Sequence, residues 1–336
     1  MEKIFANPFQ AGGRLRNPEH FVGRESELRQ ILSCVANMDS VSVVGPRRIG
    51  KSSLLHHIVA TGQQRLNQSY RFHYLDLQPL CSAEEFYNRA CEAIAGKPGS
   101  SYDDLETAID GNKIVLCLDE FEQSVKADFG AEFFHALRSL AQTGNLALVI
   151  ATKAALSQVI LRYENPLVSP FFNVFTTVKL GELTEADARA LVAKSDRFNR
   201  EETDFILRLA GAHPYWLSFV SLRLYYAKQE ARSGGGAVDF NRIERLFEDE
   251  FNGAAANNAV AANQTQQNAT TEGRAVQGSS GAIITSLLLL LAGVLFAKLS
   301  VNILAPIAGF LVSGGLILIG LMLFLFRGVN WIGGTR

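Results

Sequence analysis

The chain has 336 residues, enough for two ordinary domains, and its formal net charge is −1. Residues 1–251 hold 28 of the 32 basic and 32 of the 33 acidic residues, so this part lacks the broad basic surface of a nonspecific nucleic-acid binder. We therefore expect no nucleic-acid partner, with only a local basic patch left open. The four cysteines show neither metal-ligand spacing nor a paired framework, which favours a reduced, cytosolic main domain.

Short aliphatic runs alternate with helical patterns along the first half of the chain. The runs predict five strands, at Val41–Val44, Arg71–Leu77, Lys113–Asp119, Leu146–Thr152 and Val174–Leu180. The helical patterns lie at Glu25–Asn37, Lys51–Thr61, Ala83–Ala95 and Ala131–Ala141. This alternation predicts an α/β fold, with a parallel sheet covered by helices on both faces.

From Thr184 onward the pattern becomes wholly helical. Helices are predicted at Thr184–Ser195, Glu201–Ala210, Pro214–Ala231 and Asp239–Phe251. Thr184 and Thr203 are candidate caps, because a hydroxyl at a helix start accepts from backbone N–H groups that the helix leaves unpaired. We expect a sheet domain at 1–183 and a small helical subdomain at 184–251.

The C-terminal region changes composition twice. Residues 252–281 are rich in small and polar residues without an aromatic one, which predicts a flexible linker. Ala282–Leu299 and Ile303–Phe326 are mostly apolar and would span about 27 and 36 Å as helices, against about 30 Å of bilayer hydrocarbon. We predict a transmembrane helical hairpin at 282–326 and a short cytoplasmic tail at 327–336. A buried helix pair in a soluble protein is the alternative.

The charges that flank this hairpin predict its orientation. Arg274 precedes the first apolar segment, and Arg327 and Arg336 follow the second, so the positive-inside bias places both ends in the cytoplasm. Lys298, near the outer turn, is a mild exception. Because the N-terminus also lacks the apolar core of a secretory signal, we expect a multi-pass protein of the inner (cytoplasmic) membrane with its large domain in the cytoplasm.

A phosphate-binding pattern follows the first predicted strand. Residues 45–52 match G-x-x-x-x-G-K-[ST] completely and, with Ser53, lead into a predicted helix, whose N-terminus adds a partial positive charge. Lys51 is expected to bridge the β- and γ-phosphates and act in catalysis, and the Ser52 hydroxyl to ligate Mg²⁺. Arg47 and Arg48 are expected to contact phosphate, a neighbouring subunit or only solvent. The predicted nucleotide-binding residues here are Gly45, Pro46, Arg47, Arg48, Ile49, Gly50, Lys51, Ser52 and Ser53.

Two further strands end in polar residues. Asp119 and Glu120 follow five apolar residues, so Asp119 is predicted to hold Mg²⁺ through water and Glu120 to act as general base on the attacking water. An acidic pair that caps a helix is the alternative. Thr152 is expected to sense the γ-phosphate, with strand capping as its alternative. Arg162 is a weaker candidate for a finger that reaches a neighbour's nucleotide.

Several motifs occur in the order of a known family. They are Asn7-Pro8-Phe9, the segment Phe21–Leu28, the phosphate loop, Leu118–Glu122 and Gly211–Tyr215. Together they resemble the AAA-like branch of the STAND signalling ATPases over roughly residues 5–232. This resemblance implies an ASCE-type P-loop core with strand order 5-1-4-3-2, a helical lid, and ATP or ADP with Mg²⁺ as ligands.

The resemblance also implies site residues and a behaviour. Val22 and Arg24 belong to a segment expected to lie over adenine and ribose, and His213 and Pro214 are expected to contact nucleotide from the lid. Members of the family are usually switches, inactive with diphosphate and oligomeric with triphosphate, with slow turnover. This chain departs from them because no winged helix and no sensor repeats follow its lid.

These features favour one function over two others. We expect a membrane-anchored ATP-dependent switch whose nucleotide-driven self-association gathers the hairpins, as a bacterial defence or signalling effector would. The alternative is a membrane-tethered ATP-binding scaffold that recruits an unidentified partner. A DNA-transaction ATPase is disfavoured by the acidic main domain.

Overall fold

The computed structural model describes residues 7–15, 17–160, 171–234, 236–254 and 256. The chain divides into two units between Glu248 and Asp249, and the elements below belong to the first unit unless stated. Arg162, the linker beyond residue 256, the predicted hairpin at 282–326 and the predicted tail at 327–336 lie outside the described residues.

The predicted inner-membrane localisation has to be corrected. In the part of the chain that the structure describes, no helix is both long and apolar enough to cross a membrane. α10 (Pro214–Gly234) has sufficient length at 21 residues, but it carries Arg223, Lys228, Glu230 and Arg232. Such a density of charge is incompatible with a lipid-facing span.

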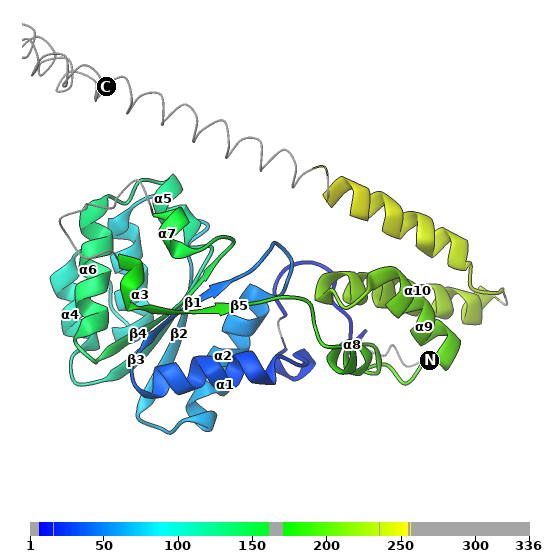
Figure 1. Ribbon diagram of the computed structural model, residues 1–336, viewed down its shortest axis with the longest axis horizontal. Helices are drawn as coiled ribbons and strands as arrows, with labels where there is room; N and C mark the ends of the chain where they lie inside the picture. The colour runs from blue at the N-terminus through cyan, green and yellow to red at the C-terminus, as the bar shows by residue number, and fades with distance from the viewer. Residues whose placement is uncertain (1–6, 16, 161–170, 235, 255, 257–336) are drawn as a thin grey trace, which may run out of the picture. The chain divides into compact units, whose positions relative to one another are not determined.

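Five parallel strands form the sheet, in the order β2-β3-β4-β1-β5 (Figure 1). This confirms the predicted order 5-1-4-3-2. The strands are β1 (Ser40–Val44), β2 (Tyr70–Asp76), β3 (Lys113–Asp119), β4 (Leu146–Thr152) and β5 (Phe175–Lys179). β4 is buried throughout, as is β3 after Lys113, because helices cover both faces of a parallel sheet.

The two faces of the sheet carry separate hydrophobic cores. Along β3, Leu116 and Leu118 pack with α3, α4 and α6, whereas Val115 and Cys117 pack with α1 and α2, as the two-residue period of a strand requires. The bounds of the helices in this domain are α1 (Glu25–Ala36), α2 (Lys51–Arg65), α3 (Ala83–Ala95), α4 (Tyr102–Ile109), α5 (Glu122–Lys126), α6 (Ala131–Gln142) and α7 (Leu156–Val159). Short 3₁₀ turns lie at Pro18–His20 (η1) and Phe171–Val174 (η3).

Among the described residues of the sheet domain, helix α4 is the longest element without a counterpart in the prediction. Ser101 and Asp104 form its capping box, in which each side chain accepts from the other's backbone N–H. The S-x-x-D pattern was present in the sequence as a signal for a helix start. The helix has only eight residues, too few for a clear amphipathic period.

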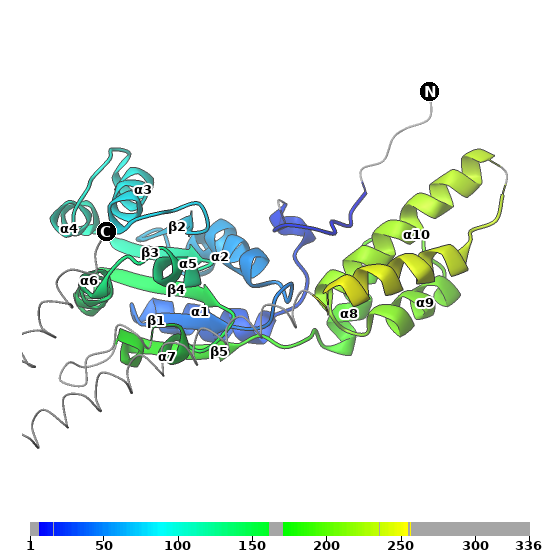
Figure 2. The same ribbon diagram turned by 90° about the horizontal axis from the view of Figure 1, so that it is seen from above.

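After β5 the chain forms a group of helices (Figure 2). They are α8 (Glu185–Val192), α9 (Arg200–Ala210), α10 and the helical residues 240–254, which continue into the second unit. Thr184 caps α8 as predicted, accepting from the Asp187 N–H. The prediction for Thr203 is wrong. Asn199 caps α9, and the Thr203 hydroxyl, one turn inside the helix, donates to the Asn199 carbonyl at 2.9 Å.

Candidate nucleotide site

The phosphate loop leaves the carboxyl end of β1 and enters α2. Gly45 is confined between neighbouring strands: its N–H donates to the Thr152 carbonyl at 3.2 Å, and an added Cβ would lie 2.8 Å from the Leu180 carbonyl oxygen. Gly50, immediately before α2, has φ of 100°, a left-handed conformation that glycine adopts without strain. The two glycines are therefore required for different reasons, close approach at one and backbone conformation at the other.

Lys51 is almost fully buried, with 8% of its surface exposed. Its Nζ donates to the carbonyl oxygens of Gly45 at 2.7 Å and Pro46 at 2.9 Å, so the loop itself holds the ammonium group. Burial lowers the pKa of Lys51, and the charges of Glu122, Glu120 and Asp119 oppose that shift. The ammonium group is thus positioned within the loop that the sequence assigned to phosphate.

The two predicted catalytic carboxylates follow β3. Asp119 is buried; its Oδ2 accepts from the Tyr74 hydroxyl at 2.8 Å and its Oδ1 from the Glu120 N–H at 3.0 Å. Burial and the neighbouring Asp119 charge raise the pKa of Tyr74, so its hydroxyl stays a donor. Glu120 has a positive φ of 50°, and its Oε2 lies 3.0 Å from the Lys153 Nζ.

The predicted sensor on β4 lies next to the site rather than in it. Thr152 is fully buried and its hydroxyl donates to the Ala154 carbonyl at 2.7 Å, which is the structural role left open for it. Lys153, the next residue, lines the cavity and pairs with Glu120. Its backbone N–H also donates to Glu122. The sequence showed this lysine only as the residue after the strand end, so its pairing came from the tertiary structure.

The N-terminal segment borders the same cavity. The Leu15 N–H donates to the Ser53 hydroxyl at 3.2 Å, and the Arg14 guanidinium lies 5.1 Å from the centre of the Tyr74 ring. Farther along, Phe21 stacks on His57 of α2 at 4.3 Å between ring centres. Sequence reasoning missed the stretch from Gln10 to Leu15, whose Gly12-Gly13 pair was its signal for an irregular backbone.

The lid helices supply another wall. Pro214 and Tyr215 line the cavity at the start of α10, and the Arg48 guanidinium of the phosphate loop lies 4.2 Å from the centre of the Tyr215 ring. His213 does not line the cavity. Its Nδ1 is buried without a hydrogen-bond partner among the described residues, and burial lowers its pKa.

These elements enclose a cavity of about 670 Å³, a volume typical of ligand sites. Of the predicted site residues, those that line it are Val22, Arg24, Arg47, Arg48, Ile49, Gly50, Lys51, Ser52, Ser53, Asp119, Glu120 and Pro214. Those that do not are Gly45, Pro46, Thr152 and His213. The cavity therefore brings together most of a set that spans nearly two hundred residues of sequence.

The predicted Mg²⁺ ligands suit a metal ion that binds together with the phosphates of a nucleotide. Ser52 and Asp119 line the same cavity. Among the described residues, no group of three or more His, Cys, Asp or Glu side chains is placed to hold a metal ion. Mg²⁺ commonly binds through one or two protein ligands together with phosphates and water, and this pair suits such a site.

Most of the chain matches one known protein family. The profile described as Novel STAND NTPase 1 matches residues 13–235, more than half of the chain, including the phosphate loop, Asp119, Glu120 and α8 to α10. The chain belongs to this family. It is a STAND-type P-loop NTPase, which confirms the resemblance in its coarser form. A comparison with curated proteins found no significant match.

Solved structures agree with this STAND NTPase in fold. The Walker-type ATPase of Pyrococcus abyssi has a TM-score of 0.59 and 14% identity over 93% of each chain. The ORC1 protein of Aeropyrum pernix, solved in complex with DNA, has a TM-score of 0.50 and 15% identity over 62% of this chain and 61% of its own. Domain III of the Thermotoga maritima replication initiation protein DnaA has a TM-score of 0.50 and 17% identity over 69% and 95%, respectively. At these identities the likeness shows a P-loop ATPase fold.

Proposed function

We propose that this STAND NTPase is a slow ATPase that works as a switch, with the lid responding to the bound nucleotide. The observation that carries the proposal is one cavity bordered by the phosphate loop, by Asp119 and Glu120, and by Pro214 and Tyr215 of the lid. Such an arrangement lets the same phosphates contact the catalytic groups and influence the helices that follow the sheet.

The chain's own residues divide the chemistry. Lys51 exchanges its two loop carbonyls for phosphate oxygens, to which its ammonium group donates stronger, charge-assisted hydrogen bonds. Ser52 and Asp119 would hold Mg²⁺, which would neutralise charge on the phosphates. Once the Glu120 carboxylate separates from Lys153, it orients a water molecule and accepts a proton from that water. The Arg48–Tyr215 contact joins the loop to the lid.

The proposal includes nucleotide-dependent self-association, which rests on the family resemblance. Arg47 supports it: this phosphate-loop residue is exposed and borders the cavity, where a second subunit could contact it. The signalling or defence output stays a prediction.

A second candidate function follows from the Glu120–Lys153 ion pair. A carboxylate that stays paired with an ammonium group is a poor base, so the chain would hold ATP without turnover and act as a scaffold for a partner. Multiple-turnover phosphate release from the wild-type chain separates the two candidates.

The relatives also reopen the question of nucleic acid. The Aeropyrum pernix ORC1 structure is a complex with DNA, which cuts against the predicted absence of a nucleic-acid partner. DNA binding at physiological salt, measured with and without ATP, therefore belongs among the first assays of this chain.

The central test is particle size in three nucleotide states. Light scattering on the full-length chain should show a larger species with a nonhydrolysable ATP analogue than with ADP, and with ATP a species that returns to the ADP size as hydrolysis proceeds. Lys51→Ala should bind ATP about 10- to 100-fold more weakly, because it removes one charged hydrogen-bonding group, and should stay at the ADP size. A wild-type size that ignores nucleotide, or a Lys51→Ala variant that responds like wild type, would refute the switch.

A further inference from the structure

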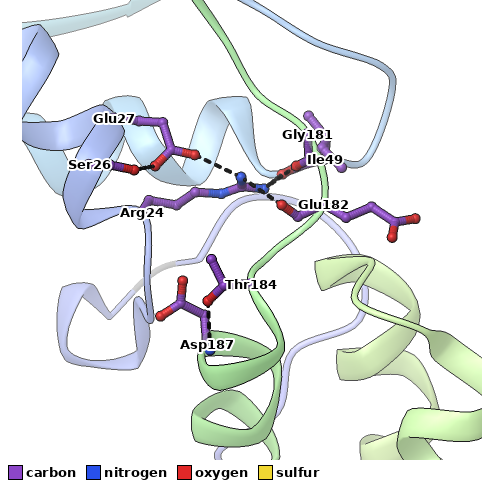
Figure 3. Close-up of polar contacts among 8 residues, drawn as sticks. All are labelled: Arg24, Ser26, Glu27, Ile49, Gly181, Glu182, Thr184 and Asp187. Atoms are coloured by element: carbon purple, nitrogen blue, oxygen red, sulfur yellow. Dashed lines mark hydrogen bonds and ion pairs between the residues drawn. The ribbon is translucent and has the colours of Figure 1, made fainter.

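Arg24 is a buried arginine at a junction of three segments. It directly precedes α1, has a left-handed φ of 66° and exposes only 6% of its surface. Figure 3 shows its guanidinium between α1, the phosphate loop and the chain that leads into the lid. A charge that is buried to this extent is costly unless nearby groups pair with it and hydrogen-bond to it.

Four acceptors surround the guanidinium. Nη1 donates to the Glu27 Oε1 at 3.0 Å and to the Glu182 carbonyl at 3.2 Å. Nη2 donates to the Gly181 carbonyl at 2.5 Å and to the Ile49 carbonyl at 3.3 Å. These acceptors account for all four N–H bonds of the two terminal nitrogens, so Arg24 binds the protein at the positions where it would otherwise bind a phosphate.

Glu27 supplies the charge that balances Arg24. Its Oε2 accepts from the Ser26 hydroxyl at 2.5 Å, so both carboxylate oxygens are engaged. Burial raises the pKa of Glu27, but hydrogen bonds from Ser26, its own backbone and Arg24 outweigh that effect and lower it. Near neutral pH the Glu27 carboxylate is therefore ionised.

The carbonyls that Arg24 joins belong to the two parts that a switch has to couple. Ile49 lies in the phosphate loop, immediately before Gly50. Gly181 and Glu182 lie between β5, which ends at Lys179, and α8, which begins at Glu185. They are the connection through which the lid is attached to the sheet.

A close contact beside Arg24 joins the same two parts. An added Cβ on Gly23 would lie 2.5 Å from the Cγ of Asp187, in the first turn of α8. The backbone before Arg24 therefore lies directly against the first lid helix. Arg24 and the backbone before it contact the segment where the lid begins, whereas Arg48 contacts the lid at α10.

We propose that Arg24 is a positioning residue that couples the phosphate loop to the lid connection, rather than a nucleotide-binding residue. The inference rests on the proposed nucleotide-responsive lid and names the residue that transmits the response. A shift of the Ile49 carbonyl as the loop closes on phosphate alters its hydrogen bond to Nη2, and the same nitrogen binds Gly181. The movement therefore passes to the lid connection through one rigid, planar group.

The test uses the full-length chain with a single reporter in the lid. The sequence has two tryptophans, so Trp331→Phe leaves Trp216, which lies on α10 with the Arg48 guanidinium 5.9 Å from its ring. Arg24→Lys keeps the charge but has only three donors on one nitrogen, and Glu27→Gln keeps the size but removes the balancing charge. Arg29→Lys is the matched control, because Arg29 is exposed on α1, the helix that Arg24 directly precedes.

Two quantities are measured for each variant: affinity for fluorescent ADP and ATP analogues, and the difference in Trp216 emission between the two nucleotide states. For Arg24→Lys and Glu27→Gln we expect affinities within about threefold of wild type, a change of less than about 0.7 kcal/mol, and loss of most of the emission difference. Arg29→Lys should match wild type in both.

Three outcomes would overturn the inference. If Arg24→Lys loses affinity tenfold or more while its thermal melt stays normal, Arg24 is a nucleotide contact. If Arg24→Lys and Glu27→Gln keep the full emission difference, the pair does not couple the loop to the lid. If both variants fail to fold, the pair is purely structural. A wild-type chain that binds no nucleotide refutes the proposed function itself, and that result is visible before any variant is made.

Discussion

At the scale of single residues, the state of Glu120 decides between the two candidate functions. Its positive φ is costly for a residue with a side chain, and its carboxylate pairs with Lys153. Strained backbone of this kind persists where surrounding structure enforces it, often at functional sites. Here the β3 end and the buried Asp119 provide that enforcement, and they direct Glu120 to the cavity.

Glu120→Gln should therefore abolish turnover without abolishing binding. Removing a general base costs about 10²- to 10⁴-fold in rate, whereas the affinity for ATP depends on Lys51 and the loop. Phosphate release under multiple turnover and binding of a fluorescent nucleotide measure the two effects separately.

Glu122→Gln is the control for that variant. Glu122 accepts from the backbone N–H of Lys153, which a glutamine side chain can also do, so we expect near wild-type turnover. Equal losses in the two variants would show that neither carboxylate is the base. An undiminished rate in Glu120→Gln would favour the scaffold function.

At the scale of elements, one glutamate links two helices of the lid. Glu202 forms a capping box with Asn199 at the start of α9, and its Oε2 lies 2.5 Å from the Nζ of Lys228 on α10. Both side chains of this ion pair are largely buried, at 9% and 16% exposed. A single carboxylate thus caps one helix and ties it to the next.

Replacing this residue should destabilise the lid strongly. Glu202→Ala removes half of a capping box and leaves the buried Lys228 ammonium group without its carboxylate partner, so we expect a loss of about 2–4 kcal/mol in the free energy of unfolding. Denaturant unfolding followed by Trp216 emission, in the Trp331→Phe background, measures it within the lid.

The neighbouring Glu201→Ala is its matched control. Glu201 is exposed on the same turn, so its loss should change stability by less than about 0.5 kcal/mol. Similar unfolding curves for the two variants would contradict the assigned role of the ion pair.

At the scale of the whole molecule, the described residues of the candidate nucleotide site belong to the first unit. Among the described residues, those that line the cavity lie between Gln10 and Ser218, inside the unit that ends at Glu248. The parallel sheet explains the location, because the carboxyl ends of β1, β3 and β4 meet at one edge and the loops that follow them converge there.

A chain that ends after residue 254 should therefore bind nucleotide like the full chain. We expect its affinities for ATP and ADP to stay within about threefold, because all of the described lining residues are kept. Isothermal titration of both proteins in parallel measures this. A tenfold weaker shortened chain would show that the second unit contributes to the site.

The sequence by itself determined the elements whose signals are local. Five apolar runs predicted the strands to within one residue at each end, and the phosphate loop followed from an eight-residue pattern beside one of them. The strand order came with the family resemblance, and the structure confirmed it. Asp119 and Glu120 belong to the same group, since a strand that ends in carboxylates is visible in the sequence.

Only the tertiary structure decided which side chains meet. Thr152 and Lys153 are adjacent in sequence, yet one donates to its own turn and the other pairs with Glu120, because successive side chains at the end of a strand point in opposite directions. The motif around Arg24 predicts a nucleotide contact, but the four acceptors of its guanidinium come from segments up to 158 residues away in sequence. Pairings between distant segments depend on burial and on competition for acceptors, and no local pattern encodes either.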